Sequence, residues 1–203
     1  MTSLLSASDL CLIRGDLCLF EGLSFALNPG ELLHVEGTNG SGKTSLLRAV
    51  AGLLEFDEGS IEWRGSPVRR QPQAFRASMA WFGHRTGLKA DLTAVENLRF
   101  ESGLRAAGAH NIDVALERVR ASKFAGLPVR AMSAGQQRRI ALARLLLADV
   151  PFWLLDEPLT NLDTAGQRLV RGLLESHLDA GGIALVASHQ ALELTRPVSR
   201  IAL

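Results

Sequence analysis

The pattern of apolar and polar residues along this chain changes twice. Up to about residue 80 the pattern is typical of strands. Between about residues 88 and 147, apolar side chains instead recur at helical spacing. After Pro151 the strand pattern returns in two runs, 152–155 and 183–187, that are apolar throughout. Strands of this kind are usually parallel and covered by helices on both faces, so the chain predicts an α/β fold.

Turn and helix signals divide these regions into elements. The expected strands before residue 80 are 17–27, 32–36 and 61–63, with turns at 14–16 and 65–67. The expected helices are 43–51, 94–105, 114–122, 137–147 and 164–180, with Gly108 in the break between the second and the third. We therefore expect a strand–helix core with a helical segment inserted in its middle.

Composition excludes some classes of protein. The 203 residues are 47% hydrophobic and 21% charged, which is ordinary for a soluble globular chain with a buried core. The net charge of +1 gives no electrostatic reason to expect nucleic acid or an anionic membrane as a partner. We find no apolar run long enough to span a membrane and no secretory signal. Cys11 and Cys18 match no thiol or metal motif, and we expect both to be buried and structural.

Residues 37–44 match the phosphate-binding pattern G-x-x-x-x-G-K-[ST] at every fixed position. The match lies where the expected strand 32–36 turns into the expected helix 43–51, which is the context that the motif requires. Lys43 is expected to reach the β- and γ-phosphates, and the Thr44 hydroxyl to bind Mg²⁺. The residues predicted to bind a nucleoside triphosphate are Gly37, Thr38, Asn39, Gly40, Ser41, Gly42, Lys43, Thr44 and Ser45.

An acidic pair follows the apolar run 152–155, which leads directly into Asp156 and Glu157. Ligands of open α/β sheets gather at the carboxyl ends of the strands, where these two carboxylates are expected. Asp156 is predicted to hold Mg²⁺, and Glu157 to polarise the attacking water as a general base. His189 follows the last apolar strand at the same edge, where we expect it to contact the γ-phosphate and orient Glu157. These residues predict a catalytic site for hydrolysis.

Residues 133–136 carry a capping-box pattern, Ser133 with Gln136, that marks a helix start. In a chain that also has the two phosphate-site elements, this segment resembles the signature motif of ABC ATPases, normally L-S-G-G-Q. Residues 161–163 are similar to the D-loop of that family. The resemblance covers nearly the whole chain. It implies a P-loop NTPase fold with a parallel sheet, an N-terminal antiparallel β subdomain and an inserted helical subdomain. The implied single ABC ATPase domain spans 1–203, with 1–83 and 148–203 as the nucleotide-binding core and 84–147 as the helical signature subdomain.

In that family, ATP is held between two subunits that are arranged head to tail. The resemblance therefore implies a homodimer, or a pair with a sister subunit, with ATP and Mg²⁺ as cofactors. It also implies that the signature of one subunit faces the γ-phosphate bound by the other. The nucleotide-binding residues added in this way are Ser133, Ala134, Gly135, Gln136 and Asp163.

Three positions depart from the pattern of the family. Ala134 stands in place of the first signature glycine, which is tolerable if its φ is negative. His84 stands in place of the Q-loop glutamine, and we expect it to bond water or metal in the catalytic site. Arg14 stands where an aromatic side chain normally stacks on adenine, and a guanidinium plane can also stack on a base. The choice between adenine and guanine is therefore left open.

Several segments (83–84, 93–100, 133–139 and 153–158) together resemble the ATP-binding subunits of bacterial cytochrome c maturation complexes. That resemblance implies an ATPase that works with integral membrane subunits at the cytoplasmic face of the inner membrane. It implies that hydrolysis serves haem export or the release of a haem-loaded chaperone. It also implies a docking surface for the membrane partner near His84. The candidate apolar residues of that surface are Phe75, Trp81, Phe82 and Leu88.

Two other functions stay open at this point. An ABC ATPase subunit could move another small cargo, because nothing in these residues addresses haem directly. A soluble ATP-driven switch acting on nucleic acid or ribosomes is the alternative from another class. Against it, the chain has one uninterrupted unit, no sustained heptads and no basic tract, so no nucleic acid is expected as a partner. A module that binds ATP without hydrolysing it would not need Glu157 and His189.

Overall fold

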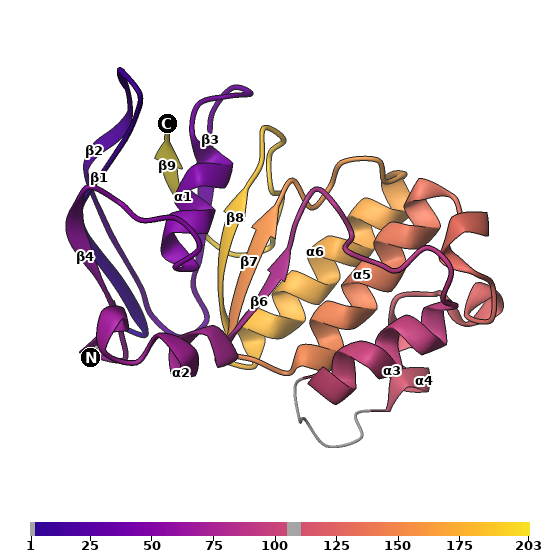
Figure 1. The fold of residues 1–203 in the computed structure, drawn as a ribbon. Helices are drawn as coiled ribbons and strands as arrows, with labels where there is room; N and C mark the ends of the chain where they lie inside the picture. The colour runs from indigo at the N-terminus through magenta and orange to yellow at the C-terminus, as the bar shows by residue number, and fades with distance from the viewer. Residues whose placement is uncertain (1–2, 105–110) are drawn as a thin grey trace.

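The computed structural model describes residues 3–104 and 111–203, and it contains two sheets (Figure 1). The antiparallel sheet has the order β2-β1-β4-β5 and consists of β1 (Leu5–Arg14), β2 (Leu17–Leu27), β4 (Glu58–Trp63) and β5 (Ser66–Pro67). The parallel sheet has the order β6-β7-β8-β3-β9 and consists of β3 (Leu32–Glu36), β6 (Met79–Phe82), β7 (Phe152–Asp156), β8 (Ile183–Ala187) and β9 (Ser199–Ala202). The two sheets confirm the predicted fold class.

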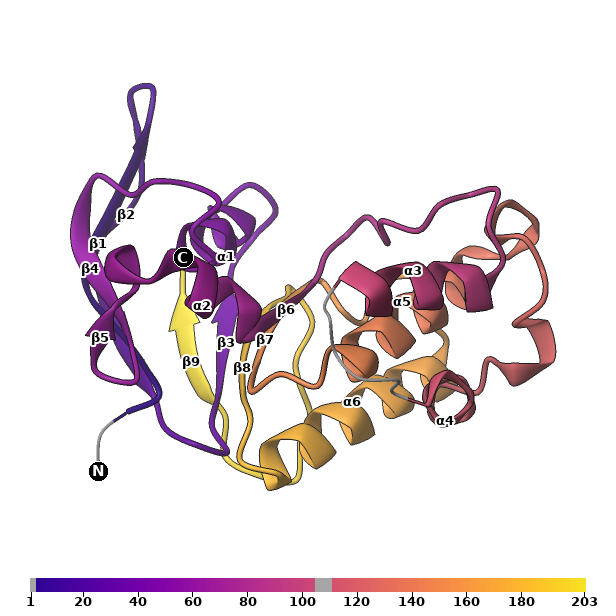
Figure 2. The same cartoon turned by 60° about the horizontal axis from the view of Figure 1, so that its bottom comes forward.

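Helices cover both faces of the parallel sheet. In the described parts of the chain they are α1 (Lys43–Val50), α2 (Pro72–Ala77), α3 (Ala94–Leu104), α4 (Ile112–Arg118), α5 (Ala134–Ala148) and α6 (Thr164–Asp179), with 3₁₀ turns at Val68–Arg70, Ser122–Phe124 and Val129–Ala131. α1 lies between the two sheets, whereas α5 and α6 lie on the other face of the parallel sheet (Figure 1). Figure 2 shows α3 and α4 on the side farthest from the antiparallel sheet. The helical insertion therefore extends the layer formed by α5 and α6.

Each face of the parallel sheet has its own apolar core. Between the two sheets, α1 completely buries Leu46 and Leu47. Phe152 at the start of β7 stacks against Trp63 with ring centroids 5.9 Å apart, and Phe75 lies 6.3 Å from Phe152. Phe75 is only 2% exposed, so it belongs to this core and the prediction of a docking role for it is wrong. The second core joins β6, β7 and β8 to the helices α3 to α6.

The long helix of the insertion, α5, begins at Ala134, before the predicted start at residue 137. The Ser133 side chain accepts a hydrogen bond from the backbone N–H of Gln136, and the Gln136 side chain accepts one from the backbone N–H of Ser133. This reciprocal capping confirms the predicted capping box and explains the earlier start. The helix predicted over 94–105 corresponds to α3. Its predicted end at Arg105, and the predicted break at Gly108, lie outside the described residues.

The helix α4 spans Ile112–Arg118 rather than the predicted 114–122. It begins earlier because the Asn111 side chain accepts hydrogen bonds from two backbone N–H groups of the first turn. It ends earlier because Arg120 adopts a left-handed φ of 56°, a conformation that commonly terminates helices. Both boundaries are thus set by single residues that an apolar periodicity does not detect.

Asn111→Ala is expected to lower the free energy of unfolding by about 1 kcal/mol, because the first turn of α4 loses its capping acceptor. Urea denaturation measures this change. Asn111→Ser keeps an accepting side chain and is the matched control, with an expected loss of about a few tenths of a kcal/mol. Equal losses in the two variants would contradict the capping role.

The two cysteines lie in different environments. Cys11 on β1 is buried and Cys18 on β2 is exposed, and both are free thiols. The predicted burial is therefore right for Cys11 and wrong for Cys18. The reason is the β1–β2 hairpin, whose end extends beyond the rest of the molecule (Figure 1). Cys18 pairs with the exposed Ile13 close to the turn of this hairpin.

The parallel sheet brings four distant segments to one edge. The carboxyl ends of β3, β6, β7 and β8 point the same way because these strands are parallel. The segments that leave these ends are 37–42, 83–87, 157–163 and 188–189. Each of them contains residues that the sequence singled out as candidates for binding or catalysis. The fold thus assembles the candidate site at the edge where α/β sheets bind their ligands.

Candidate nucleotide-binding site

The glycine loop joins β3 to α1 in a conformation that favours glycine. Gly42 precedes α1 with a left-handed φ of 105° and provides no side-chain cap. A Cβ at Gly37 would collide with the Ser41 hydroxyl and would lie 2.7 Å from the carbonyl oxygen of Leu203. Because side chains are excluded here, backbone N–H groups at the start of α1 can approach an anion closely.

Two side chains of this loop are arranged as an anion site requires. Lys43 is 6% exposed, and its Nζ donates to the carbonyl oxygens of Gly37 at 2.7 Å and Thr38 at 2.8 Å. The Ser41 Oγ is buried and makes no hydrogen bond to any residue in 3–104 or 111–203. A buried hydroxyl without a partner is costly, and a phosphate oxygen would satisfy it. The hollow beside the loop measures about 240 Å³ and is lined by Leu19, Asn39, Gly40, Gly42, Lys43, Thr44, Ser45 and Glu157.

The two predicted magnesium ligands lie in contact although they are 112 residues apart. The Thr44 Oγ1 lies 3.1 Å and 3.0 Å from the two carboxylate oxygens of Asp156. Asp156 is 5% exposed, and this burial raises the pKa of its carboxyl, an effect that the Thr44 hydroxyl opposes. Mg²⁺ at nucleotide sites typically takes one or two protein oxygens and completes its shell with phosphate and water. The pair therefore fits a magnesium ion that binds together with a nucleotide.

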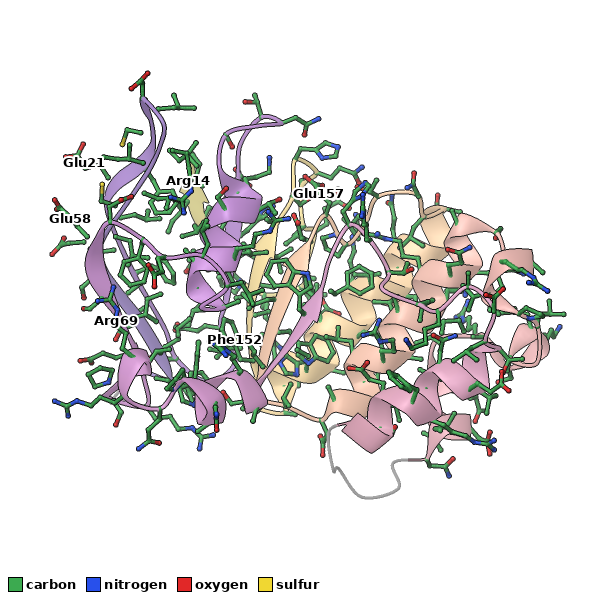
Figure 3. All side chains as sticks on the ribbon, in the orientation of Figure 1. Arg14, Glu21, Glu58, Arg69, Phe152 and Glu157 are labelled. Carbon is green, nitrogen blue, oxygen red and sulfur yellow. The ribbon has the colours of Figure 1, made fainter. Side chains whose placement is uncertain are left out.

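Glu157 leaves β7 with a left-handed φ of 50°, which is uncommon for a residue other than glycine. Such conformations cost about 1–3 kcal/mol and cluster at active sites. The Glu157 carboxylate accepts a hydrogen bond of 3.2 Å from the backbone N–H of His189 and lies 2.8 Å from His189 Nδ1. Figure 3 shows Glu157 beyond the end of β7, whereas Phe152 marks the start of that strand. The structure thus joins the predicted base to the predicted histidine.

The signature segment lines a second hollow. This hollow measures about 500 Å³, and its walls include His84, Ala134, Arg138 and Asn161. Ala134 begins α5 in a helical conformation, so its φ is negative, as replacement of glycine requires. Among the described residues, the two hollows have no lining residue in common. Within one chain, the phosphate loop and the signature segment therefore lie at two separate hollows.

Asp163 and Arg14 have structural contacts of their own. The Asp163 side chain caps α6 by accepting a hydrogen bond of 2.7 Å from the backbone N–H of Gly166. Arg14 donates to the carbonyl oxygens of Ile13 and Glu55, both at 3.1 Å. Figure 3 shows Arg14 near the antiparallel sheet. Stacking of a base on Arg14, and contact of Asp163 with a second subunit, stay predictions.

Several residues at these hollows had no role predicted from the sequence, and Leu19 and Arg138 are two of them. Leu19 on β2 lines the hollow beside Lys43, where it offers an apolar surface next to the phosphate loop. Arg138 lies within the stretch that carried the family resemblance and is only 3% exposed. Alternation along β2 could have shown that Leu19 shares a face with other apolar residues, but not which neighbour that face meets. Helical spacing places Arg138 on the same face as Leu142 and Leu145, so an arginine on an apolar helix face was the available signal.

Comparison with known proteins places these features in a family. The family model described as ABC transporter matches residues 20–160. The "Cytochrome c biogenesis ATP-binding export protein CcmA" of Methylococcus capsulatus is 51% identical over 192 residues, which cover 94% of this chain and 93% of that protein. Proteins of the same name from Vibrio vulnificus and Nitrosomonas europaea are 44% and 46% identical, covering 97% and 95% of this chain and 97% and 91% of their own lengths.

Solved structures agree on the fold. An ATP-binding subunit of an ABC transporter superposes with a TM-score of 0.82 at 22% identity, covering 92% of this chain and 80% of that one. CbiO1 from Clostridium perfringens, part of the ABC transporter complex CbiONQ, superposes with a TM-score of 0.75 at 24% identity, covering 93% of this chain and 79% of that one. With relatives that match nearly the full length, this chain belongs to the ABC transporter ATP-binding family, among the cytochrome c biogenesis ATP-binding export proteins.

Proposed function

We propose that this chain is the ATP-binding and ATP-hydrolysing subunit of an ABC complex that serves cytochrome c biogenesis. The observation that carries the proposal is the contact of Thr44 with Asp156 at the phosphate loop, beside the contact of Glu157 with His189. Thr44 at the start of α1 and Asp156 at the end of β7 supply oxygens that can bind a metal ion. Glu157, just after β7, supplies a carboxylate that His189 orients. The names and high identity of the relatives support the cellular role.

Each group of the phosphate loop and the acidic strand end has a task in hydrolysis. Lys43 would exchange its two loop carbonyls for oxygens of the β- and γ-phosphates. Thr44 and Asp156 would hold Mg²⁺, which neutralises charge on the β- and γ-phosphate oxygens. Glu157 would accept a proton from the attacking water. With its proton on Nδ1, His189 donates to the Glu157 carboxylate and fixes the orientation of that carboxylate.

We infer that two copies close head to tail around two ATP molecules. The separation of the phosphate loop from the signature segment within one chain supports this arrangement, because a second chain can bring the two together. The start of α5 would then offer its N–H groups and positive dipole end to the γ-phosphate. His84 lines the same hollow as the signature segment and is proposed to bond the attacking water or the metal. The residues proposed to cross this interface are Ser133, Ala134, Gly135, Gln136 and Asp163.

The proposed partners are integral membrane subunits of the same complex, and the proposed location is the cytoplasmic face of the inner membrane. No helix within 3–104 or 111–203 is both long and apolar enough to cross a bilayer. A hollow of about 210 Å³, with Trp81, Arg85 and Glu101 in its walls, is the proposed contact region for these subunits. Phe82 is only 3% exposed and belongs to the core, so it is not proposed as a docking residue. It lies where the proposed nucleotide-binding core (1–83 and 148–203) meets the proposed helical subdomain (84–147). Leu88 lines the neighbouring hollow.

Purification of the tagged chain from a mild detergent extract is expected to retrieve integral membrane proteins of cytochrome c biogenesis. A haem absorbance band in the complex would support haem export or release of a haem-loaded chaperone. Arg85 is exposed at the proposed contact region and does not line the hollow beside the phosphate loop, so Arg85→Glu is expected to weaken retrieval while leaving ATP binding at that loop intact. Membrane partners without haem would favour another cargo. Retrieval of ribosomes or nucleic acid instead would favour the soluble switch and contradict the proposal.

A further inference from the structure

Arg138 is a buried cation on α5. Its side chain reaches the backbone just after the end of β7, at Glu157. Its side chain is almost completely covered, and its guanidinium carbon lies 4.7 Å from the centre of the Phe82 ring. The guanidinium donates one hydrogen bond to the carbonyl oxygen of Glu157 and another, at 3.5 Å, to the carbonyl oxygen of His84. Arg138 therefore connects the helix that begins at the signature segment with the ends of β6 and β7, two neighbouring strands (Figure 1).

The contact with Glu157 falls on a strained part of the backbone. A left-handed φ at a glutamate persists only where the surroundings fix it on both sides. On the amino side, the Glu157 N–H donates to the Ala187 carbonyl oxygen at 2.8 Å. On the carboxyl side, the Glu157 carbonyl oxygen accepts from Arg138 and from the N–H of Thr160 at 3.3 Å. The backbone conformation sets the direction in which the Glu157 side chain leaves the chain, so a group that holds this carbonyl oxygen can act on the carboxylate through the backbone.

The positive charge of Arg138 lies close to the carboxylates of Asp156 and Glu157. Burial lowers the pKa of the guanidinium, and the nearby carboxylates Asp156 and Glu157 oppose this effect. Arginine nevertheless stays protonated in proteins, so a permanent positive charge faces both carboxylates. Burying such a charge only to fill space would be costly, and replacement by an apolar side chain is often neutral or stabilising for structural pairs. Three specific contacts on functional segments indicate a different reason for its presence.

A second arginine of α5 holds the segment that follows β6. Arg144 donates to the Thr86 carbonyl oxygen at 2.6 Å and to the Glu101 carboxylate on α3 at 2.9 Å. Arg138 and Arg144 thus bind the chain at residues 84 and 86 from one helix. Only Arg138 reaches the Glu157 carbonyl oxygen as well, which makes Arg144 a useful comparison for separating the two effects.

We propose that Arg138 is a positioning residue that fixes Glu157 for hydrolysis by bonding its backbone to the signature helix, an inference that rests on the proposed function. The planar guanidinium bonds two carbonyl oxygens while its carbon lies over the Phe82 ring, a combination that the compact ammonium group of a lysine does not reproduce. The turnover number should therefore depend on Arg138, while nucleotide affinity, which comes from the phosphate loop, should not.

Steady-state ATP hydrolysis, equilibrium ATP binding and thermal unfolding of Arg138→Gln and Arg138→Lys test the proposal. Misplacement of a catalytic group by about 1 Å costs about 100-fold, so kcat of Arg138→Gln should fall by roughly 10–100-fold while the Kd for ATP changes by less than about 2-fold. Arg138→Lys should recover part of kcat. Arg171→Gln is the matched control, because Arg171 is a partly buried arginine that pairs with Glu193 away from both hollows. Its kcat should equal that of the parent.

The outcomes separate this inference from the proposed function. Parental kcat in Arg138→Gln, or kcat and ATP affinity that fall together in proportion to a loss of folded protein, would overturn the positioning role. If Arg138→Gln does not fold, Arg138→Lys decides, and parental kcat in that variant has the same consequence. A kcat for Arg144→Gln as low as that for Arg138→Gln would assign the effect to the 84–86 segment rather than to Glu157. If Glu157→Gln itself turns over ATP at the parental rate, the proposed function fails whatever Arg138 does.

Discussion

Glu157→Gln is expected to lower kcat for ATP hydrolysis by about 10²–10⁴-fold, the usual contribution of a general base. The substitution keeps the size of the side chain and its ability to accept hydrogen bonds from His189, so ATP should still bind. ATP that binds without being cleaved should hold two chains together. Turnover measured by phosphate release, and size-exclusion chromatography with ATP and Mg²⁺, report the two effects separately.

Glu117→Gln is the matched control, because Glu117 is an exposed glutamate on α4 and should give parental turnover and a parental elution profile. Turnover of Glu157→Gln at the parental rate would show that another group activates the water. An inactive variant that stays monomeric with ATP would leave Glu157 as the base but would contradict the head-to-tail dimer. The experiment therefore tests the catalytic residue and the assembly independently.

The contacts that the sequence predicted share one physical basis. The residues that make these contacts lie at or after the carboxyl end of an apolar strand. Parallel strands bring their carboxyl ends to one edge of the sheet, whatever their separation along the chain. This is why the sequence alone predicts that Thr44 lies beside Asp156, and Glu157 beside His189. The capping box at Ser133 was predictable for a different reason, since it depends on residues of one helical turn.

The contacts that escaped prediction depend on side-chain direction rather than on element order. The guanidinium of Arg14 reaches the carbonyl oxygen of Glu55 in the loop before β4, whereas Leu19 lines the hollow beside the phosphate loop. Cys18 is exposed near the end of the β1–β2 hairpin, which extends beyond the rest of the molecule, whereas Cys11 is buried. Arg138 folds back from a helix onto a strand end, and neither periodicity nor spacing specifies such a tertiary contact. A local pattern defines an element and its register, but it does not identify the neighbour that each face meets.

Lys43→Ala is expected to weaken ATP binding by about 10–100-fold, which corresponds to the loss of charge-assisted hydrogen bonds worth about 1.5–3 kcal/mol. The Lys43 Nζ already lies between two loop carbonyl oxygens at 2.7 Å and 2.8 Å, so its stem directs the charge over the predicted phosphate site. Titration calorimetry with ATP measures the affinity, and Lys123→Ala, at an exposed lysine, is the control that should bind as the parent does.

Removal of Lys43 also frees the two carbonyl oxygens that it binds, so a looser loop could weaken ATP binding without any direct contact to phosphate. Lys43→Arg separates these explanations, because a guanidinium can still donate to the Gly37 and Thr38 carbonyl oxygens but is bulkier than an ammonium in the space left for phosphate. If the ammonium itself contacts phosphate, Lys43→Arg should retain the thermal stability of the parent and still bind ATP poorly. Parental affinity in Lys43→Ala would mean that the hollow beside the loop does not hold the phosphates, and the role of Thr44 and Asp156 as magnesium ligands would fail with it.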